Sequence, residues 1–454
     1  MSNTICALST PAGLGAIALI RISGNEAFTI TETLFSEKLH FNDLPPQVAR
    51  FAQLYDGDQV IDQVVVVKYA HPRSFTGEDM VEISCHGSIY IQRTILQLLV
   101  ARGCRMAAPG EFTQRAFLNG KLDLPQAEAI ADLIDSQTET AHKLAINQLK
   151  GGFSNKIKEL REQFVTLASL IELELDFSEE DVEFANRDEL KRLLSDIKVE
   201  VDRLIRSFKM GNALKNGIPV AIVGKPNAGK STLLNAILQH ERAIVSSIPG
   251  TTRDTIEDTF NIKGTLFRFI DTAGIRNAND EIESIGIERT YQAAQQANVI
   301  LYMVDITSTT PAQLEEELAV FRSNIDLADK KLVVVANKID GQENADVSWK
   351  MNDMVRISAK ERTNIEAIEG LLEAYVAEAG IRDFSLLTNE RHYAHLTNIM
   401  GSIQRIENGM AMGIPTDLLA EDVRAALYDL GSLTGTISTD ELLGNIFGKF
   451  CIGK

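Results

Sequence analysis

Apolar residues follow three different spacings along the chain, and each spacing predicts a different kind of structure. Near the N-terminus, short apolar runs lie between Gly and Pro residues, a pattern typical of strands and the turns that join them. The predicted strands are Ala16–Ile22, Val60–Tyr69 and Met80–Cys85, and a helix is predicted in SIYIQRTILQLLVARG, directly after the third. Residues 1–118 are therefore expected to form an α/β domain.

The spacing changes to alternating steps of three and four in residues 119–214. This spacing places apolar side chains on one stripe of a long helix. The stripe comprises Ile157, Leu160, Phe164, Leu167 and Ile171. A second helix is predicted from about Arg187 to Met210. Helical spacing returns in residues 380–454, at Leu418, Leu419, Val423, Ala426, Leu427 and Leu430.

Residues 215–379 contain apolar runs that alternate with helical segments: IPVAIVG, TLFRFID, VILYMVD, KLVVVANK and MVRISA. Such runs indicate strands buried on both faces of a mainly parallel sheet. Because helical segments flank this region on both sides, we expect it to be inserted into one helical domain formed by residues 119–214 and 380–454. The predicted fold class is multidomain, α/β plus α.

Composition and charge limit the classes of function. The chain has 454 residues and a formal net charge of −18, so as a whole it does not show the basic character of a protein that binds nucleic acid alone. If it acts on nucleic acid, we expect a partner or one local patch to supply the positive surface. Its four cysteines form no CxxC motif, so neither a zinc site nor a redox dithiol is expected. Scattered cysteines of this kind favour a reducing, cytoplasmic location. The longest N-terminal apolar run, Leu14–Ile20, is too short to span a membrane.

A phosphate-binding loop is predicted at GKPNAGKS, Gly224–Ser231. It follows a predicted buried strand and precedes a predicted helix, as the GxxxxGK[ST] pattern requires. The glycines let backbone N–H groups surround phosphate oxygens at a helix N-terminus. Lys230 can reach the β- and γ-phosphates, and the Ser231 hydroxyl is a suitable Mg²⁺ ligand.

Four further motifs predict that the nucleotide is GTP or GDP. DTAG at residues 271–274 supplies Asp271 for Mg²⁺ through water, and IPGTTRD supplies Thr252 as a second Mg²⁺ ligand. In NKID, Asp340 can accept hydrogen bonds from guanine N1 and N2, and Asn337 can bracket O6; SAK lies behind the base. The residues expected to contact GTP are Asn227, Ala228, Gly229, Lys230, Ser231, Thr232, Ser246, Ser247, Ile248, Pro249, Gly250, Thr251, Thr252, Asp271, Thr272, Ala273, Gly274, Asn337, Lys338, Asp340, Ser358 and Ala359.

Two positions depart from Ras-like GTPases. Ile275 follows DTAG, where Ras-like proteins carry the glutamine that orients the attacking water. Glu281 and Glu283 lie in the next segment and are candidates for that task, although surface loops commonly carry solvated carboxylates. Asn227 in the phosphate-binding loop can help to hold a monovalent cation, which would neutralise developing charge where other GTPases use an arginine finger.

The segments outside the GTPase region resemble the tRNA-modification GTPase family called MnmE or TrmE. The resemblance rests on LIRISG, SFTGEDMVEISCHG, PGEFTQRAFLNGKLDLPQAEAIADLI and the terminal CIGK, and it extends over the whole chain in order. It implies a homodimer that acts on tRNA with a flavoprotein partner, MnmG (GidA), in a heterotetramer or larger complex. Together they install an aminomethyl or carboxymethylaminomethyl group at C5 of the wobble uridine, with GTP hydrolysis.

The resemblance also implies roles for individual residues. The N-terminal domain would dimerise and bind a 5-formyl-tetrahydrofolate-type ligand through Arg21, Glu82, Lys121 and Lys454. The implied K⁺ ligands are Asn227, Ser246, Ile248 and Thr251, and family members often carry threonine where Ser246 stands. Glu283 matches the family's catalytic glutamate and is therefore preferred over Glu281.

Two other readings of the chain remain open. A ribosome-assembly switch of the Era type would share the GTPase motifs, but such proteins append basic RNA-binding domains that this acidic chain lacks. A one-carbon transferase with an attached GTPase differs from the leading hypothesis in whether the folate carbon ends on tRNA.

Three further groups of residues are candidates for a catalytic or metal-binding role. His392 and His395, in RHYAH, have metal-ligand spacing but no third ligand nearby, so a surface or interface role is favoured. Cys85 and His86 are adjacent on a predicted strand and should point to opposite faces. Cys451 in CIGK lacks the context of a prenylation signal. The resemblance implies an ordered tail near the folate pocket, in which Cys451 is a nucleophile, a packing residue or a tRNA contact.

Overall fold

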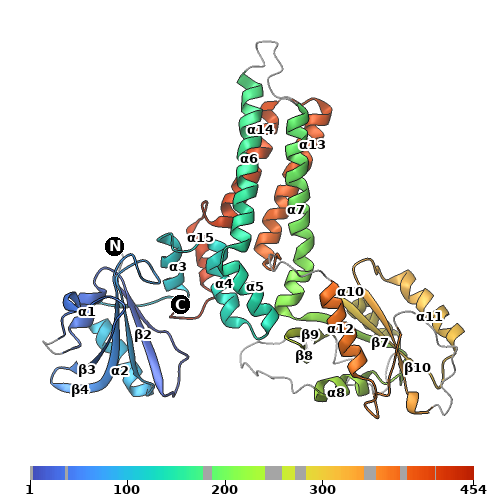
Figure 1. The fold of residues 1–454 in the computed structure, drawn as a ribbon, viewed down its shortest axis with the longest axis horizontal. Coiled ribbons are helices and arrows are strands. Elements are labelled where there is room, and N and C mark those ends of the chain that lie inside the picture. The colour runs from blue at the N-terminus through green and yellow to red at the C-terminus, as the bar shows by residue number, and fades with distance from the viewer. Residues whose placement is uncertain are drawn as a thin grey trace. The chain divides into compact units, whose positions relative to one another are not determined.

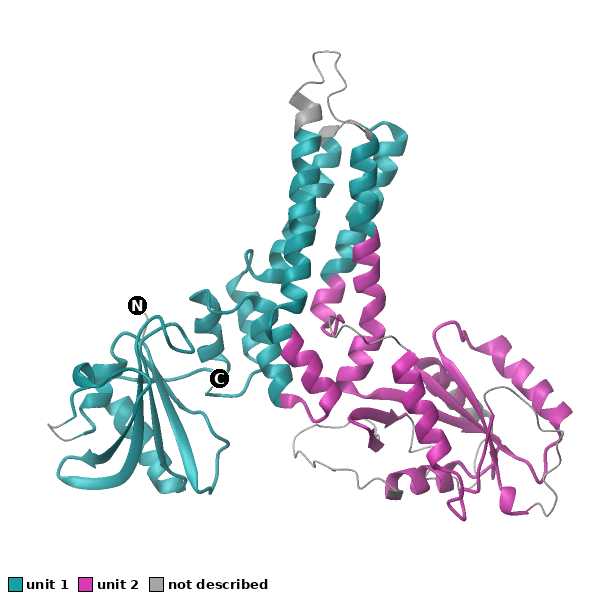
Figure 2. Cartoon of the chain, viewed as in Figure 1, with its two compact units in different colours: residues 1–134, 148–198, 395–454 teal, residues 135–147, 199–394 magenta. Residues whose placement is uncertain are grey.

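The computed structural model describes residues 4–35, 39–176, 187–240, 258–270, 283–341, 354–378, 386–414 and 416–453 (Figure 1). The chain divides into two compact units (Figure 2). One unit comprises residues 1–134, 148–198 and 395–454, and the other comprises residues 135–147 and 199–394. In the described part of the chain, no helix is both long and apolar enough to cross a membrane.

The first unit contains a six-stranded sheet of order β3-β4-β5-β2-β1-β6. Its pairs are antiparallel except for β1 with β6. The strands are β1 (Ile5–Leu8), β2 (Ile17–Ser23), β3 (Ala49–Asp56), β4 (Gln59–Tyr69), β5 (Met80–His86) and β6 (Arg105–Met106). The three predicted strands are confirmed as β2, β4 and β5; β1, β3 and β6 were not predicted, because short strands carry too few residues to show a clear period.

One face of this sheet forms an apolar core with α1 (Ala27–Glu32) and α2 (Ile89–Ala101). Along β2, Ile20 and Ile22 are fully buried in this core. Because successive side chains on a strand point to opposite faces, Arg21 lies on the other face. That second face is therefore available for polar chemistry.

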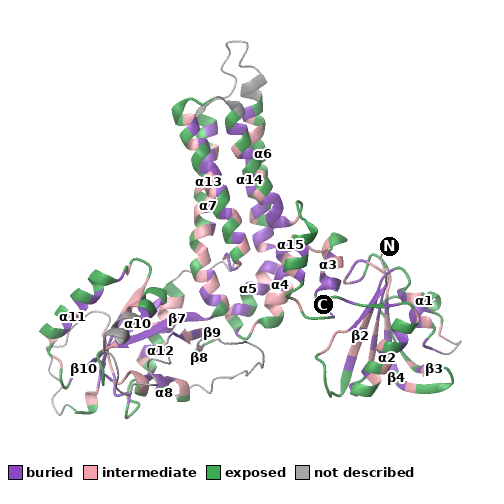
Figure 3. Cartoon of the chain, turned by 180° about the vertical axis from the view of Figure 1, so that it is seen from behind, coloured by how far each residue is buried: buried purple, intermediate pink, exposed green. Residues whose placement is uncertain are grey.

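The helices of the first unit include residues from both sides of the GTPase motifs. Besides α1 and α2, they include α3 (Glu111–Leu118), α4 (Leu124–Asp135), α6 (Gly152–Asp176), α14 (Thr416–Thr434) and α15 (Asp440–Phe447). The predicted stripe on α6 is at most 2% exposed, and α6 packs along α14 (Figure 3). Leu418 was wrongly assigned to the apolar stripe of α14: its side chain is 55% exposed, near the start of the helix.

The second unit contains the predicted parallel sheet, of order β12-β11-β10-β7-β9-β8. All its pairs are parallel except β8 with β9. Its strands are β7 (Ile218–Gly224), β8 (Asp258–Ile262), β9 (Thr265–Phe269), β10 (Val299–Asp305), β11 (Lys331–Asn337) and β12 (Met354–Arg356). The apolar runs thus gave the correct strands, while the antiparallel edge strand β8 was missed.

Helices cover both faces of the parallel sheet, which explains why its central strands are apolar throughout. One core includes side chains of α8 (Lys230–His240) and α12 (Glu366–Glu378), and the other includes α10 (Glu283–Gln296) and α11 (Pro311–Asn324). The remaining helices are α5 (Glu139–Leu149), α7 (Arg187–Asn216) and α13 (Glu390–Met412), with short 3₁₀ turns at Phe41–Asp43 and Ile339–Gly341.

The C-terminal tail is held against the first unit as far as residue 453. Phe447 is buried with residues of α4, the Gly110 N–H donates to the Cys451 carbonyl at 3.3 Å, and the Ser9 hydroxyl donates to the Gly453 carbonyl at 3.0 Å. Gly453 has φ +94°, and a Cβ there would overlap the Leu8 carbonyl. Glycine is therefore required at this contact, and the expected ordered tail is confirmed for residues 447–453.

Candidate functional site

The phosphate-binding loop joins the end of β7 to the start of α8. Gly224 and Gly229 have φ of +142° and +102°, and a Cβ at either would overlap Met303 or Asn337. Asn227 adopts φ +64°, a left-handed conformation that asparagine tolerates better than most residues. The backbone therefore follows the tight curve that GxxxxGK[ST] predicts, with the N-terminus of α8 at its end.

Lys230 is held by the loop that it closes. Its Nζ donates to the carbonyls of Gly224 at 2.7 Å and Lys225 at 2.9 Å. Burial lowers the pKa of the Lys230 ammonium, as expected for a cation that is removed from water. An ammonium has three donors, so one remains for a phosphate oxygen. Ser231 and Thr232 lie beside it in the first turn of α8, so the loop fits a nucleotide phosphate chain.

Asn337, at the end of β11, joins two loops of this site. Its Nδ2 donates to the Ala228 carbonyl at 2.8 Å, and its Oδ1 accepts from the Ala359 N–H at 2.9 Å. The side chain is only 3% exposed. The sequence predicts that Asn337 brackets the base; in the structure, both ends of its amide hold the phosphate loop against the loop that follows β12.

Asp340 lies one short turn after β11 and is exposed. The Ser358 hydroxyl donates to its Oδ1 at 2.5 Å, and this hydrogen bond lowers the pKa of the Asp340 carboxyl. Ser358 itself is buried and accepts a hydrogen bond from the Glu361 N–H. A carboxylate fixed in this way can accept two N–H groups from a guanine edge, which adenine lacks.

Asp305, at the end of β10, was not predicted as part of the site. It pairs with Lys338 through Oδ2 and Nζ at 2.6 Å, while Thr307 donates to its Oδ1. Burial opposes ionisation of Asp305, but these hydrogen bonds outweigh it and lower its pKa. The signal was present in the sequence: VILYMVD ends in a carboxylate, and the carboxyl ends of neighbouring parallel strands meet at one sheet edge.

Part of the predicted GTP site lies outside the described residues. This part includes the proposed switch and Mg²⁺ segments and the side chain of Glu283, whose backbone begins α10. The predicted GTP contacts concerned are Ser246, Ser247, Ile248, Pro249, Gly250, Thr251, Thr252, Asp271, Thr272, Ala273 and Gly274. Ile275, the candidate Glu281 and the predicted folate contact Lys454 also lie outside the described residues.

Arg21 and Glu82 meet on the second face of the N-terminal sheet. They are direct cross-strand neighbours on β2 and β5, and Arg21 donates to Glu82 Oε1 from Nε at 3.0 Å and from a terminal nitrogen at 2.8 Å. Both side chains are 16% exposed. The Arg21 guanidinium lies 5.1 Å from the ring centre of Phe75 and 5.7 Å from that of Phe112. The structure thus brings two of the four predicted folate contacts together beneath aromatic side chains.

Lys121 lies after α3, and its Nζ donates to the Pro72 carbonyl at 3.2 Å in the loop between β4 and β5. The same loop is held by Asn119, whose amide donates to the Thr76 carbonyl at 2.8 Å. Lys121 is exposed and therefore accessible to a ligand. It does not contact Arg21 or Glu82 through any hydrogen bond between described residues.

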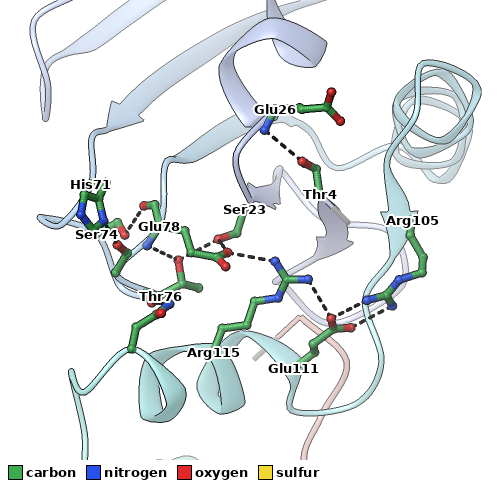
Figure 4. A network of polar contacts seen from close by, with 12 residues as sticks. Thr4, Ser23, Glu26, His71, Ser74, Thr76, Glu78, Arg105, Glu111 and Arg115 are labelled. Carbon is green, nitrogen blue, oxygen red and sulfur yellow. Dashed lines mark hydrogen bonds and ion pairs between the residues drawn. The ribbon is translucent and has the colours of Figure 1, made fainter. Parts of the chain in front are cut away.

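A polar network not predicted from the sequence fixes α3 against this loop (Figure 4). Arg115 bridges Glu78 at 2.9 Å and Glu111 at 3.0 Å, while Arg105 also pairs with Glu111. Burial opposes the Glu111 charge, but donors from Arg105, the Ala108 N–H and Arg115 outweigh it and lower the Glu111 pKa. Glu78, Glu111 and Arg115 fall within the resemblance motifs, so part of those motifs serves to build the fold.

The histidine pairs show no metal site. A surface or interface role was predicted for His392; its side chain is 1% exposed, so the surface part of that prediction is wrong. His395 pairs with Asp429 at 2.7 Å. No group of metal ligands occurs among the described residues. Cys85 is buried and His86 is exposed, as predicted for neighbours on a strand; His86 pairs with the buried Asp62.

Cys451 is exposed, whereas the other three cysteines are buried. Its backbone carbonyl is held by Gly110, which lies beside α3. The thiol can therefore reach solvent from a fixed segment. Its chemical role stays a prediction.

Comparison with known proteins covers nearly the whole chain. A model of the GTP-binding protein TrmE N-terminus matches residues 4–121, and a model of the MnmE helical domain matches residues 124–451. A tRNA modification GTPase MnmE of Cytophaga hutchinsonii is 49% identical, with 100% of this chain and 98% of that protein covered. The protein of the same description from Flavobacterium psychrophilum is also 49% identical, with 100% and 99% covered.

Proposed function

The chain belongs to the MnmE (TrmE) family of tRNA modification GTPases, and from that membership we propose that it hydrolyses GTP to support modification of wobble uridine. With a flavoprotein partner of the MnmG (GidA) type, it would install an aminomethyl or carboxymethylaminomethyl group at C5. The GTPase part is supported by three side chains around one site. Lys230 closes the phosphate loop, Asn337 bonds to that loop, and Asp340 is held by Ser358. One cluster thus combines a phosphate loop with a guanine-selective carboxylate.

The chain's own residues have separate tasks in this proposal. Lys230 holds the phosphates, and Asp340 selects guanine while Ser358 orients it. Ser231 and Thr252 would hold Mg²⁺, which supplies charge neutralisation at the phosphates when bound. The Ser231 position in the first turn of α8 fits that role, because hard oxygen donors are what Mg²⁺ takes.

A potassium ion is proposed beside the phosphates, held by Asn227, Ser246, Ile248 and Thr251. Support comes from Asn227, which sits in the phosphate loop in a left-handed conformation. Glu283 is proposed to orient the attacking water, since Ile275 cannot. Replacing Na⁺ by K⁺ should raise the rate of GTP hydrolysis at least about tenfold, because one group that stabilises developing charge can contribute about 10²–10³-fold. Equal rates in the two salts would remove the ion from the proposal.

Glu283→Ala tests the water-orienting role separately. General-base contributions of about 10²–10⁴-fold predict a fall in kcat with nucleotide affinity retained. Glu281→Ala is the matched control, two residues away. A larger loss in the control variant would reverse the assignment of the two glutamates.

A tetrahydrofolate of the 5-formyl type is proposed as the ligand of the N-terminal domain. Arg21 and Glu82 would contact the ring edge, while Lys121 and Lys454 would meet the anionic glutamyl tail. The fit rests on a half-buried polar pair beneath Phe75 and Phe112, which is the kind of lining that a flat, polar heterocycle requires. One-carbon units would reach the uridine from this ligand, with Cys451 as a candidate catalytic residue.

We propose that the chain acts as a homodimer in the cytoplasm and that tRNA contact is shared with the flavoprotein. The net charge of −18 supports this division, because an acidic protein has little surface with which to neutralise phosphates. The isolated chain should therefore bind tRNA weakly and with strong salt dependence. Tight binding that is unchanged between 50 and 200 mM salt would contradict the shared contact.

The function as a whole is tested in cells that lack this chain. Mass spectrometry of tRNA should show loss of the C5 group from wobble uridine, and the intact gene should restore it. A gene that carries Lys230→Ala serves as the matched control for GTP dependence and should fail to restore the modification. Normal wobble uridine in the deleted strain would refute the proposed function.

A further inference from the structure

Tyr69 lies on the same face of the N-terminal sheet as Arg21 and Glu82. In the register of β4 and β5, Val67 is opposite Glu82, and Tyr69 is two residues further along β4. Residues two apart on a strand share a face. The Tyr69 hydroxyl donates to Glu82 Oε2 at 3.2 Å. No sequence motif pointed to this residue.

We propose that Tyr69 is a positioning residue of the folate site: it fixes the Glu82 carboxylate so that Oε2 receives an N–H donor from the edge of the ligand's ring. The inference rests on the proposed folate-binding function. It assigns Tyr69 a role through Glu82 rather than a contact with the reacting atoms.

The acceptor capacity of Glu82 explains why Oε2 is the oxygen left for a ligand. Two carboxylate oxygens offer about four lone-pair positions. Arg21 fills two of them on Oε1, and Tyr69 fills one on Oε2. The remaining acceptor position is therefore on the oxygen that Tyr69 holds. A planar N–H donor, such as the aminopyrimidine edge of a pterin, matches that position.

Both partners of Glu82 are themselves held. Arg21 lies against Phe75 and Phe112, and these aromatic faces favour a guanidinium. Burial, followed by the charge of Glu82, raises the pKa of Tyr69, so its hydroxyl keeps its proton near neutral pH. Glu82 therefore accepts hydrogen bonds from β2 through Arg21 and from β4 through Tyr69. Without the Tyr69 hydroxyl, the Glu82 carboxylate should rotate more freely about Oε1, and the position of Oε2 should no longer be fixed.

The test compares two tyrosines of the same sheet. Tyr69→Phe removes only the hydroxyl that meets Glu82, and Tyr55→Phe removes a hydroxyl whose partner is Gln53 at 2.7 Å on the same strand, β3. Calorimetric titration with 5-formyl-tetrahydrofolate should give a Kd raised about 3–10-fold for Tyr69→Phe, the scale of one ordinary hydrogen bond, because the loss acts on the ligand only through Glu82. Tyr55→Phe should match the wild type, and Tm should change by less than about 2 °C in both.

A double-mutant cycle with Glu82→Asp separates positioning from a general structural effect. Aspartate is one methylene shorter and cannot keep the contact with Tyr69. If Tyr69 acts through Glu82, its removal should no longer change the Kd in the Glu82→Asp background, because interacting residues are non-additive. An equal Tyr69→Phe penalty in both backgrounds would overturn the inference.

The outcomes distinguish this inference from the function on which it rests. No binding of 5-formyl-tetrahydrofolate by the wild type would refute the folate function itself, and with it the role of Tyr69. Wild-type binding with an unchanged Kd in Tyr69→Phe would overturn only the role of Tyr69. A lowered Tm with an unchanged Kd would mark Tyr69 as structural.

Discussion

The candidate nucleotide site and the candidate folate site are built in different ways. The nucleotide site lies where parallel strands end, and most of its chemistry comes from short consecutive motifs whose glycines shape the backbone. The folate site lies in the middle of a sheet, on side chains that come from three strands, one loop and α3. The first depends on loop conformation, and the second depends on strand register.

This difference predicts how each site should respond to single substitutions. In the nucleotide site, side chains such as Asp340 act at exposed positions and can be replaced without disturbing the core. In the folate site, Arg21, Glu82 and Tyr69 hold one another, so a change at one residue alters the others. Substitutions should therefore give separable effects in the first site and coupled effects in the second.

Among the substitutions that test this comparison, the largest effect is expected for Asp340→Asn, which changes a single functional group of the nucleotide site. Asparagine cannot accept both guanine N–H groups, but it can pair with xanthine, which presents a carbonyl instead of the 2-amino group. Loss of paired polar groups costs about 1–3 kcal/mol each, so GTP affinity should fall about 10–100-fold and XTP should be preferred. Competition binding with labelled GDP measures this preference.

Asp326→Asn is the matched control for the base-specificity test. Its side chain accepts a hydrogen bond from the Ala328 N–H in an exposed turn of the same unit, and an amide can replace that contact. Nucleotide preference should be unchanged in this variant. Retained preference for GTP in Asp340→Asn would mean that base selection lies elsewhere.

An intermediate effect is expected for Gly453→Ala, which tests how the tail is held by the Ser9 hydroxyl and by the close approach of Gly453 to Leu8. The positive φ and the overlap with the Leu8 carbonyl make alanine unfavourable by about 1–3 kcal/mol. The tail should detach more often, and carboxypeptidase should release the C-terminal lysine about 5–100-fold faster than from the wild type.

Gly444→Ala is the control for the tail experiment, because a Cβ at Gly444 meets nothing within 4 Å. Its release rate should equal that of the wild type. Folate affinity in Gly453→Ala should fall together with tail protection if the tail contributes to that site. Unchanged protease sensitivity of Gly453→Ala would show that the tail contact contributes little to holding the segment.

The smallest effect is expected for Asp305→Asn, which breaks the ion pair with Lys338. The folded pKa of Asp305 is lowered, so its contribution to stability is complete above the ordinary Asp pKa of about 3.9 and is lost as pH falls through the folded value. Asp305→Asn should therefore lower the urea midpoint near pH 7 slightly, by an amount equivalent to about 0.5–1 kcal/mol. This penalty should shrink as the pH is lowered through the folded pKa of Asp305.

Urea titrations at pH 7 and at successively lower pH values at which the wild type stays folded measure this pH dependence. Lys338→Met removes the same ion pair from the other side and should give a similar loss at pH 7. A penalty for Asp305→Asn that stays constant across pH would mean that the loss is steric rather than electrostatic.

Much of the nucleotide site could be predicted because its motifs are consecutive. The phosphate loop of Gly224–Ser231 fixes spacing, backbone shape and charge within eight residues. The role of Asn337 in joining two loops and the pairing of Asp305 with Lys338 were not predicted, because each depends on which strand lies next to which. Sequence order gives the strands but not their neighbours.

The sequence by itself determined the strands of the parallel sheet, the apolar stripe of α6, the phosphate loop and the family. These features depend on local periodicity and on short spacings, which are visible along one chain. Only the tertiary structure decided that His392 is buried, that Leu418 is exposed, that residues 447–453 return to Leu8 and Gly110, and that Tyr69 shares a carboxylate with Arg21. Burial and partnership arise from contacts between distant segments, and no local pattern specifies them.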